Sequence, residues 1–386
     1  MKKVVSTEKK PIKLWLTDLE DGALAQAKNL ANLPFVFKHI PIMPDSHQGY
    51  GMPIGSILAT KGVVVPNAVG VDIGCGICAM RTSLKSVSKE DLKKTLAIAR
   101  ALIPLGFNWH DAPQDEALMP KGQEDLKIVS GAYIKGTKQL GTLGGGNHFV
   151  EIQQGSDGYI WIMIHSGSRA LGYTVAKHYN HVAIKLNERY HSTVTKKMEL
   201  AFLPIETEEA KDYIAEMNYC IEYAFANRKL MMTRMTNALT EVVGIFDCGE
   251  IINKSHNFAA WEKHYGESVL VHRKGATRAY KDEFGMIPGS QGTSSYIVKG
   301  LGNPESFMSC SHGAGRKMGR KQAQRELNLE HEIELLNQKG VIHAIRHASD
   351  LDEATGAYKD IDVVMENQRD LAEVVVELTP LAVLKG

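Results

Sequence analysis

The sequence predicts an α+β fold, a single compact domain over residues 1–386 with mixed sheets and a helical segment inserted at about 206–243. Three observations indicate this fold. Short apolar runs separated by glycine turns occupy the first 80 residues, and a nearly unbroken apolar run lies at 159–164. Apolar residues keep helical spacing through 206–243. Neither an internal repeat nor a linker divides the chain, so one domain is expected.

The first half of the chain predicts strands, one helix and a loop. Residues 55–60 and 62–66 are strand-like and lead into the glycine-rich loop at 70–76. A helix is expected over 88–103, because Ser88 and Asp91 resemble a capping box and Leu92 and Leu96 follow at helical spacing. The polar stretch 107–121 predicts a surface loop. The run at 159–164 predicts a buried strand that places His165 at its carboxyl end, where α/β proteins locate their chemistry.

The second half of the chain is expected to contain helices and a final strand. Ile214, Met217, Ile221 and Phe225 predict one long helix or two consecutive helices within 206–243, with a structural role. Residues 328–337 have helical character, and the last strand is expected over 371–384.

Composition limits the possible partners. The chain has 45 basic and 44 acidic residues, so any contact with RNA must come from a local patch. No run approaches the ~18 apolar residues that a membrane span needs, so we expect no membrane partner and a cytoplasmic location. Five cysteines without a secretion signal argue against a disulfide framework. Cys75 and Cys78 leave a zinc knuckle or a redox pair open, but no second pair accompanies them.

Several residues have side chains that could bind a metal ion. They lie in glycine-rich loops or at strand ends, and they are Asp72, Cys75, His148, His165 and His256. Together they would form a mixed set of oxygen, nitrogen and sulfur ligands, which suits Mn, Fe, Co or Zn better than Ca. Spacing alone does not bring them together, and a single histidine in such a loop is more often structural.

Three glycine loops could bind phosphate through exposed N–H groups, although each could also be only a tight turn. They span residues 141–146, 288–292 and 312–316. Neither a P-loop motif nor the Lys-x-Asp-Gly motif of ATP-dependent nucleic-acid ligases is present. In the third loop His312 has small neighbours and is followed by Arg316. A neutral imidazole there could attack phosphorus, or it could be a buried histidine in a turn. His191 and His347 match the His-x-Ser/Thr pair of cyclic-phosphate phosphoesterases, but both lie in surface-like sequence.

These segments resemble the RtcB-type RNA-splicing ligase family. The matching motifs occur in family order from residue 44 to the end of the chain, at 44–51 (PDSHQGYG), 70–76 (GVDIGCG), 143–151 (LGGGNHFVE), 165–169 (HSGSR), 273–276 (RKGA), 287–290 (IPGS), 309–316 (SCSHGAGR), 358–362 (YKDID) and 383–386 (VLKG). The resemblance implies a distinctive α+β fold. It also implies GTP- and Mn-dependent joining of an RNA 3′-phosphate or 2′,3′-cyclic phosphate to a 5′-hydroxyl, in RNA repair or tRNA splicing.

The resemblance also assigns residues. His312 would be the guanylylated nucleophile. Cys75 would bridge two Mn²⁺ ions, with His165 and His256 completing one site and Asp72 and His148 the other. The residues around GTP would be Asn147, Phe149, Glu151, Asn257, Pro288, Gly289, Ser290, Gln291, Ser295, Gly313, Ala314, Gly315 and Lys385. Arg169 and Arg316 would contact RNA phosphates, because guanidinium groups bind phosphate oxygens in pairs.

Alternatives and departures accompany this interpretation. A specialised relative that mainly guanylylates 3′-phosphate ends, a metal-dependent phosphoesterase and a catalytically silent RNA-binding module remain open. The activating protein archease is a candidate partner. The chain is compact between residues 105 and 140, Gln291 stands where many members carry Met, and Cys78 falls outside the family's ligand set and is expected in the core.

Overall fold

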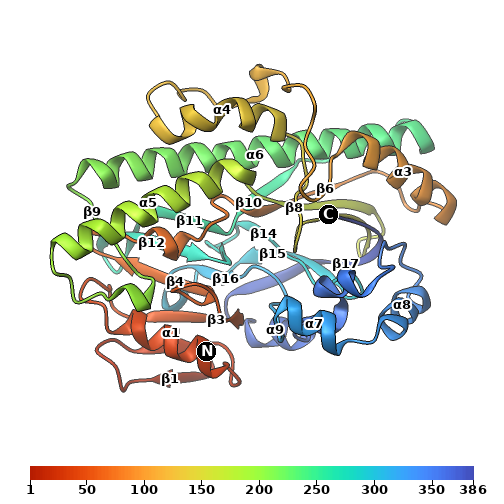
Figure 1. The fold of residues 1–386 in the computed structure, drawn as a ribbon. Coiled ribbons are helices and arrows are strands. Elements are labelled where there is room, and N and C mark those ends of the chain that lie inside the picture. The colour runs from red at the N-terminus through yellow and green to blue at the C-terminus, as the bar shows by residue number, and fades with distance from the viewer.

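The computed structural model describes residues 1–386 as a mixed α/β fold, 37% helical and 27% strand, which confirms the predicted fold class. Two large sheets form its frame (Figure 1). The first sheet has six strands in the order β1-β2-β3-β4-β12-β11, antiparallel except for the parallel pair β2 and β3. Its strands are β1 (Lys3–Val5), β2 (Ile12–Leu14), β3 (Ile40–His47), β4 (Ile54–Thr60), β12 (Glu267–Lys274) and β11 (Asn257–His264).

The second sheet has seven strands in the order β10-β6-β8-β7-β17-β15-β14, all paired antiparallel. Its strands are β10 (Ile252–Ser255), β6 (Gly76–Arg81), β8 (Ile160–Ser166), β7 (Phe149–Gly155), β17 (Ala372–Lys385), β15 (Ser295–Gly300) and β14 (Phe284–Ile287). The expected strands at 159–164 and 371–384 correspond to β8 and β17. Two small sheets pair β13 (Ala276–Arg278) with β16 (Ser309–Ser311) and β5 (Val63–Val64) with β9 (Leu203–Pro204).

Nine α-helices surround the sheets (Figure 1). They are α1 (Asp21–Ala31), α2 (Pro66–Val69), α3 (Lys89–Leu102), α4 (Lys127–Gln139), α5 (Arg169–Arg189), α6 (Glu208–Val243), α7 (Arg320–Glu326), α8 (Leu329–Gln338) and α9 (Ile361–Asn367). None of them combines the length and the apolar character needed to cross a bilayer. The expected loop at 107–121 is irregular apart from a 3-10 turn at Glu116–Leu118.

The start of α3 follows the predicted signal, with one difference. The Ser88 hydroxyl accepts a hydrogen bond from the Asp91 backbone N–H at 3.1 Å, which satisfies one of the free donors of the first turn. The Asp91 carboxylate accepts from the same hydroxyl at 2.7 Å and does not reach back to the backbone of Ser88. The cap is therefore a serine N-cap, not a reciprocal capping box.

The segment 206–243 forms one helix of 36 residues, α6, which runs along one side of the molecule (Figure 1). Its buried residues Met231, Met235 and Leu239 belong to the same core cluster as Ile162 and Ile164 of β8. Burying side chains of this size contributes about 1.5–3 kcal/mol each. The helix is thus part of the core that supports the second sheet.

The register of the second sheet aligns functional residues at one end of the strands. Ile77 of β6 pairs with His165 of β8, which pairs with Phe149 of β7, which pairs with Lys385 of β17. Successive residues of a strand point to opposite faces, so this register decides which side chains meet. Four strands that lie far apart in the sequence therefore end at one place.

Cys78 lies in the core, as expected. All five cysteines are free, and Cys78 is completely buried within the second sheet's core cluster. Its thiol lies 3.8 Å from the Arg228 carbonyl oxygen. Burial raises the pKa of this thiol to about 12, so it remains protonated and packs as a small apolar group.

Candidate active site

A cysteine and three histidines bring their ligand atoms together at the end of the second sheet. Cys75 Sγ lies 3.4 Å from His148 Nε2 and 3.3 Å from His165 Nε2. His165 Nε2 lies 3.4 Å from His256 Nε2, and His148 Nε2 lies 3.1 Å from Asp72 Oδ2. The structure therefore unites all five residues that the sequence suggested as ligands. We call them the metal cluster.

Backbone carbonyls fix two of the imidazole rings. His148 Nδ1 lies 2.9 Å from the Leu143 carbonyl oxygen, and His165 Nδ1 lies 3.1 Å from the Asn147 carbonyl oxygen. A carbonyl only accepts hydrogen bonds, so Nδ1 must carry the proton in each ring. Each ring therefore presents Nε2, the nitrogen that these carbonyls leave free, to the cluster, which is the arrangement typical of metal-binding histidines.

The electrostatics of the metal cluster fit a bound cation. Burial lowers the pKa of His165 and of His256 well below the usual value, so both rings are neutral ligands. Burial and the nearby Asp72 carboxylate raise the pKa of the Cys75 thiol well above its usual value. The protonated thiol has only one proton to share between the two histidine nitrogens and the Asp72 carboxylate that surround it. A divalent cation would relieve this and favour the thiolate, and the ligand types suit Mn, Fe, Co or Zn.

Helix α6 braces the loops of the metal cluster. Arg228 is completely buried and donates to the carbonyl oxygens of Gly74 at 2.9 Å and Ser166 at 2.8 Å. Asn227 accepts from the Gly141 N–H at 2.7 Å and donates to the Gly167 carbonyl at 3.1 Å. Sequence reasoning missed both residues, because helical spacing identifies a buried face and not the bonds that its polar members make.

His312 is held beside the metal cluster by a residue that the sequence analysis did not assign. Its ring centroid lies 4.7 Å from that of His256. Asp45 Oδ2 lies 2.7 Å from His312 Nδ1 and accepts from the His312 backbone N–H at 3.1 Å. Burial alone would raise the pKa of Asp45, but His312 holds it below its usual value. The Nδ1 proton therefore stays on the ring, and Nε2 is the nitrogen that Asp45 leaves free for chemistry.

The glycine after this histidine is required by close packing. Gly315 has a φ of +74°, and a Cβ atom there would lie 2.0 Å from the backbone oxygen of Asp45. A side chain would clash and would also strain the backbone. The loop at 312–316 consequently sits against β3, which carries Asp45.

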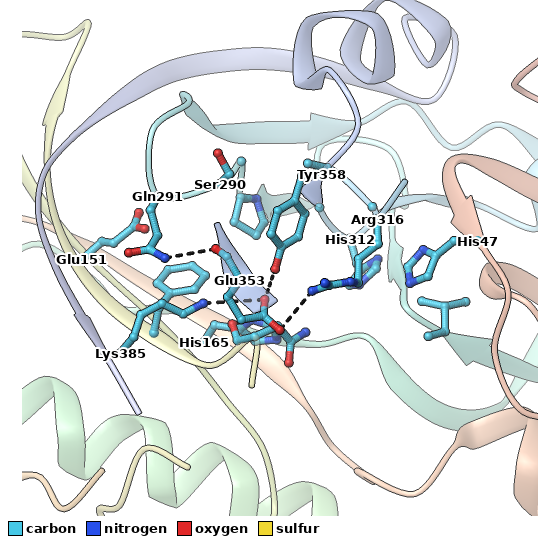
Figure 2. A pocket seen from close by; sticks show the side chains of 18 of the residues that line it. His47, Glu151, His165, Ser290, Gln291, His312, Arg316, Glu353, Tyr358 and Lys385 are labelled. Atoms are coloured by element: carbon cyan, nitrogen blue, oxygen red, sulfur yellow. Dashed lines mark hydrogen bonds and ion pairs between the residues drawn. The ribbon is translucent and has the colours of Figure 1, made fainter. Parts of the chain in front are cut away.

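One pocket joins His312 to most of the residues expected around GTP (Figure 2). The expected residues that line it are Asn147, Phe149, Glu151, Pro288, Gly289, Ser290, Gln291, Gly313, Ala314, Gly315 and Lys385, together with His165 and Arg316. Asn257 and Ser295 do not line it. Asn257 bonds the Asp72 carbonyl at 3.1 Å and the Gly275 N–H at 2.8 Å, and Ser295 Oγ accepts from the Gly289 N–H at 3.2 Å. Ser295 thus supports the pocket wall at Gly289, whereas Asn257 braces the loop that carries Asp72.

A buried carboxylate organises the cations at one side of this pocket. Glu353 pairs with Arg316 at 3.0 Å, Arg320 at 2.9 Å and Lys385 at 3.8 Å, and the Tyr358 hydroxyl donates to it (Figure 2). Burial would raise the pKa of Glu353, but Lys385 and Arg316 hold it below its usual value. We call these five residues the Glu353 cluster. Sequence reasoning missed its centre, because nothing in the spacing around residue 353 distinguishes it from a surface acid.

Arg169 contacts the loops beside the metal cluster. Its Nε donates to Thr142 Oγ1 at 3.2 Å and its Nη2 to the Gly106 carbonyl at 3.3 Å. Burial would raise the pKa of Asp72, but His148 and, more weakly, Arg169 hold it below its usual value. Of the two arginines expected at RNA phosphates, Arg316 lines the pocket and Arg169 lies near the Asp72 carboxylate.

Comparison with known proteins identifies the family. The family model described as tRNA-splicing ligase RtcB matches residues 26–127 and 106–386. The chain is 38% identical to the RNA-splicing ligase RtcB of Escherichia coli K12 over 411 aligned residues, which cover 99% of both chains. It is 31% identical to the tRNA-splicing ligase RtcB of Thermococcus kodakarensis, with 95% of this chain and 92% of the relative covered. The chain therefore belongs to the RtcB family of RNA-splicing ligases.

Proposed function

We propose that this chain is an RNA ligase that joins an RNA 3′-phosphate or 2′,3′-cyclic phosphate end to a 5′-hydroxyl end, in tRNA splicing or RNA repair. GTP would be the co-substrate, and residues 1–386 would act as one catalytic domain. The names of the relatives support RNA splicing and ligation. The observation that carries the chemistry is His312, oriented by Asp45 and facing both the metal cluster and the pocket of Figure 2.

The metal cluster would hold two Mn²⁺ ions, with Cys75 shared, His165 and His256 on one ion, and Asp72 and His148 on the other. Bound there, the ions would offset phosphate charge as Lewis acids. The fit rests on the converging ligand atoms described above.

Guanosine would lie along the pocket wall that carries Glu151 and Lys385. Guanine offers N1–H and N2–H donors, which a carboxylate can accept and which adenine does not present together. Burial raises the pKa of Glu151 to about 7, although Lys385 and Gln153 act in the opposite direction. About half of the Glu151 side chains are thus ionised at neutral pH, and this ionised form would select GTP over ATP.

The first covalent step would form a histidine–GMP bond. His312 Nε2 would attack the α-phosphorus of GTP, so that a P–N bond forms and the P–O bond to the leaving pyrophosphate breaks. Asp45 would keep the proton on Nδ1 and balance the positive charge that the ring gains. An imidazole attached to phosphorus is a good leaving group, so the bond can be broken in the next step.

The later steps would transfer GMP and then seal the RNA. An oxygen of the RNA 3′-phosphate would attack the phosphorus of histidine–GMP, and the P–N bond would break. The 5′-hydroxyl of the second strand would then attack the RNA 3′-phosphorus, expelling GMP and losing its proton to water. A cyclic phosphate would first be opened by water. Arg169 and Arg316 would hold RNA phosphates, and archease would be an activating partner.

Labelling with GTP tests the nucleotide and the nucleophile together. The protein is incubated with Mn(II) and GTP labelled at the α-phosphate, and the adduct is mapped. We expect the label on His312, none in His312→Ala, and labelling slowed by about 10²–10⁴-fold in Asp45→Asn. Absence of label in the wild-type chain, or a label that survives His312→Ala, would overturn the proposal.

Product analysis separates the ligase from its alternatives. Oligonucleotides with 3′-phosphate and 5′-hydroxyl ends should yield a joined strand, with the 3′-guanylylated strand appearing only transiently. Accumulation of the guanylylated strand would instead indicate a capping enzyme. Phosphate release without GTP, unaffected by His312→Ala, would indicate a phosphoesterase.

A further inference from the structure

Two exposed aromatic side chains lie on the loop that follows α3. Phe107 is the most exposed large hydrophobic residue of the protein, with its whole side chain in solvent. Trp109 is 43% exposed, and Lys135 Nζ lies 5.0 Å from the centre of its ring. The Phe107 ring has no packing role, and two exposed aromatic rings on one turn offer an apolar surface to a ligand.

Hydrogen bonds fix the backbone of this loop on both sides of the aromatic residues. The Gly106 N–H donates to the Gly144 carbonyl at 3.0 Å, and the His110 N–H donates to the Lys138 carbonyl at 3.0 Å. Between them, the Asn108 N–H donates to the Leu105 carbonyl at 3.1 Å. The rings are therefore presented on an anchored turn, which limits the entropy lost when a ligand stacks on them.

The anchor of the loop is shared with the active site. The Leu143 N–H donates to the Pro104 carbonyl at 3.0 Å, and the Leu143 carbonyl accepts from the metal-cluster residue His148 at 2.9 Å. Arg169 donates to the Gly106 carbonyl at 3.3 Å, one residue before Phe107. The loop from α3 to α4 also passes the C-terminus of the chain in Figure 1. Phe107 thus stands at the rim of the site, next to an arginine.

The chemistry of this rim favours a single nucleic-acid strand. Aromatic rings beside cations bind unpaired bases by stacking, while the cations bind the backbone phosphates. Arg169 and Lys135 supply such cations on either side of the aromatic pair. The loop also carries the acids Asp111, Asp115 and Glu116, of which Asp115 caps the 3-10 turn by accepting from the Ala117 N–H at 2.9 Å.

We propose that Phe107, with Trp109 beside it, is a stacking platform for an unpaired base of the RNA strand near the reacting end. This inference rests on the proposed function and adds an RNA-binding residue to it. It also gives a role to the compact stretch between residues 105 and 140, where the chain departs from its family.

Steady-state ligation with Phe107→Ala tests the platform. Loss of stacking should raise the KM for the RNA oligonucleotide by about 5- to 150-fold. Formation of histidine–GMP, measured without RNA, should keep its wild-type rate. Phe107→Trp should restore most of the RNA affinity. Ile245→Ala is the matched control, because Ile245 is also almost fully exposed but lies outside the site.

RNA with abasic positions distinguishes stacking from any other effect of the substitution. Wild-type and Phe107→Ala proteins should bind equally once the stacked base is removed. Abasic positions placed in the 3′-phosphate strand and in the 5′-hydroxyl strand, one at a time, identify which strand carries that base.

Three results would overturn the inference. They are an unchanged KM in Phe107→Ala, an effect that persists on every abasic RNA, and a parallel loss of histidine–GMP formation. An unchanged KM would leave the aromatic pair to a protein partner. Failure of the proposed function would look different, because the wild-type chain would then take no GMP label at all.

Discussion

The metal cluster and the Glu353 cluster lie beside the same pocket, but their charges are organised in opposite ways. The metal cluster presents neutral ligand atoms and a carboxylate to one another, and no cationic side chain neutralises them within it. The Glu353 cluster places three cationic side chains around one carboxylate. The first arrangement is completed by a cation. The second is already bonded and retains positive charge that suits the phosphates of a nucleotide or RNA.

The difference predicts how each cluster responds to the loss of its centre. Removing Cys75 takes away a ligand and leaves no charge unpaired in the protein itself. Removing the Glu353 carboxylate leaves buried cations without a partner, which is much more costly to the fold. Loss of Cys75 should therefore lower mainly the rate of ligation, and loss of the Glu353 carboxylate should lower mainly the free energy of unfolding.

The largest effect is expected for Cys75→Ala. Loss of the shared ligand should lower the rate of ligation by about 10³-fold or more, because several kcal/mol of charge stabilisation depend on the metal ions. The wild-type chain should also gain about 2.7 kcal/mol of stability at a Mn(II) concentration 100 times its Kd, seen as a rise in Tm. Cys75→Ala should lose most of this gain.

Cys78→Ala is the control for that experiment, since Cys78 is an equally buried thiol three residues away. It should retain the Mn(II)-dependent rise in Tm. An identical response of the two variants would mean that Cys75 is a core residue and not a ligand.

Glu353→Ala should have the next largest effect, a loss of about 3–5 kcal/mol in the free energy of unfolding. Arg316 and Lys385 would remain largely buried without their carboxylate. Glu353→Gln should cost less, because the amide oxygen still accepts one of these bonds. Urea unfolding of the three proteins measures both values, and equal stability of Glu353→Ala and wild type would contradict the account.

The difference in stability between wild type and Glu353→Ala should depend on pH in one direction. The pKa of Glu353 is lower in the folded chain than its ordinary value of 4.5, so its stabilising effect is present above that pH. It is lost as the pH falls and the carboxylate becomes protonated. The gap in stability between wild type and Glu353→Ala should narrow accordingly in acid.

Helices and strands that depend on neighbouring residues could be predicted from short sequence signals. Ser88 caps α3, and the apolar run before His165 is β8. Helix α5 was missed although its buried Leu171, Val175 and Tyr179 recur every four residues, so the signal was present. The helix begins at Arg169, the last residue of the HSGSR motif, so the helical period starts directly where the motif ends.

Sequence motifs predicted individual residues of the site but not the contacts between them. Resemblance named the metal ligands and His312, and the structure brings them together. The partner of His312 is Asp45, 267 positions away, and the centre of the cation cluster is Glu353. Long-range pairs of this kind depend on strand order and register. Spacing along one chain contains no information about either.

Protonation of Glu151 in the pocket should have a smaller effect, a weaker binding of GTP. Its pKa of about 7 means that this carboxylate, which we propose binds GTP, is half protonated at neutral pH. GTP should therefore bind about tenfold more weakly for each pH unit below 7 and reach a plateau above it. Calorimetry across this range measures the Kd. Glu151→Gln should bind weakly with no such slope, and a slope that persists in Glu151→Gln would assign the titration to another group.

The smallest effect is expected for Gln291→Met, which installs the residue that many RtcB members carry. Gln291 is buried, and its amide donates to the Glu353 backbone carbonyl at 3.0 Å. Methionine removes this bond at a cost of about 0.5–1.5 kcal/mol, partly offset by its apolar surface. Urea unfolding should show that small loss, and the KM for GTP should hardly change. A large rise in that KM would instead mean that Gln291 binds the nucleotide, which would separate its role from that of the Glu353 cluster it supports.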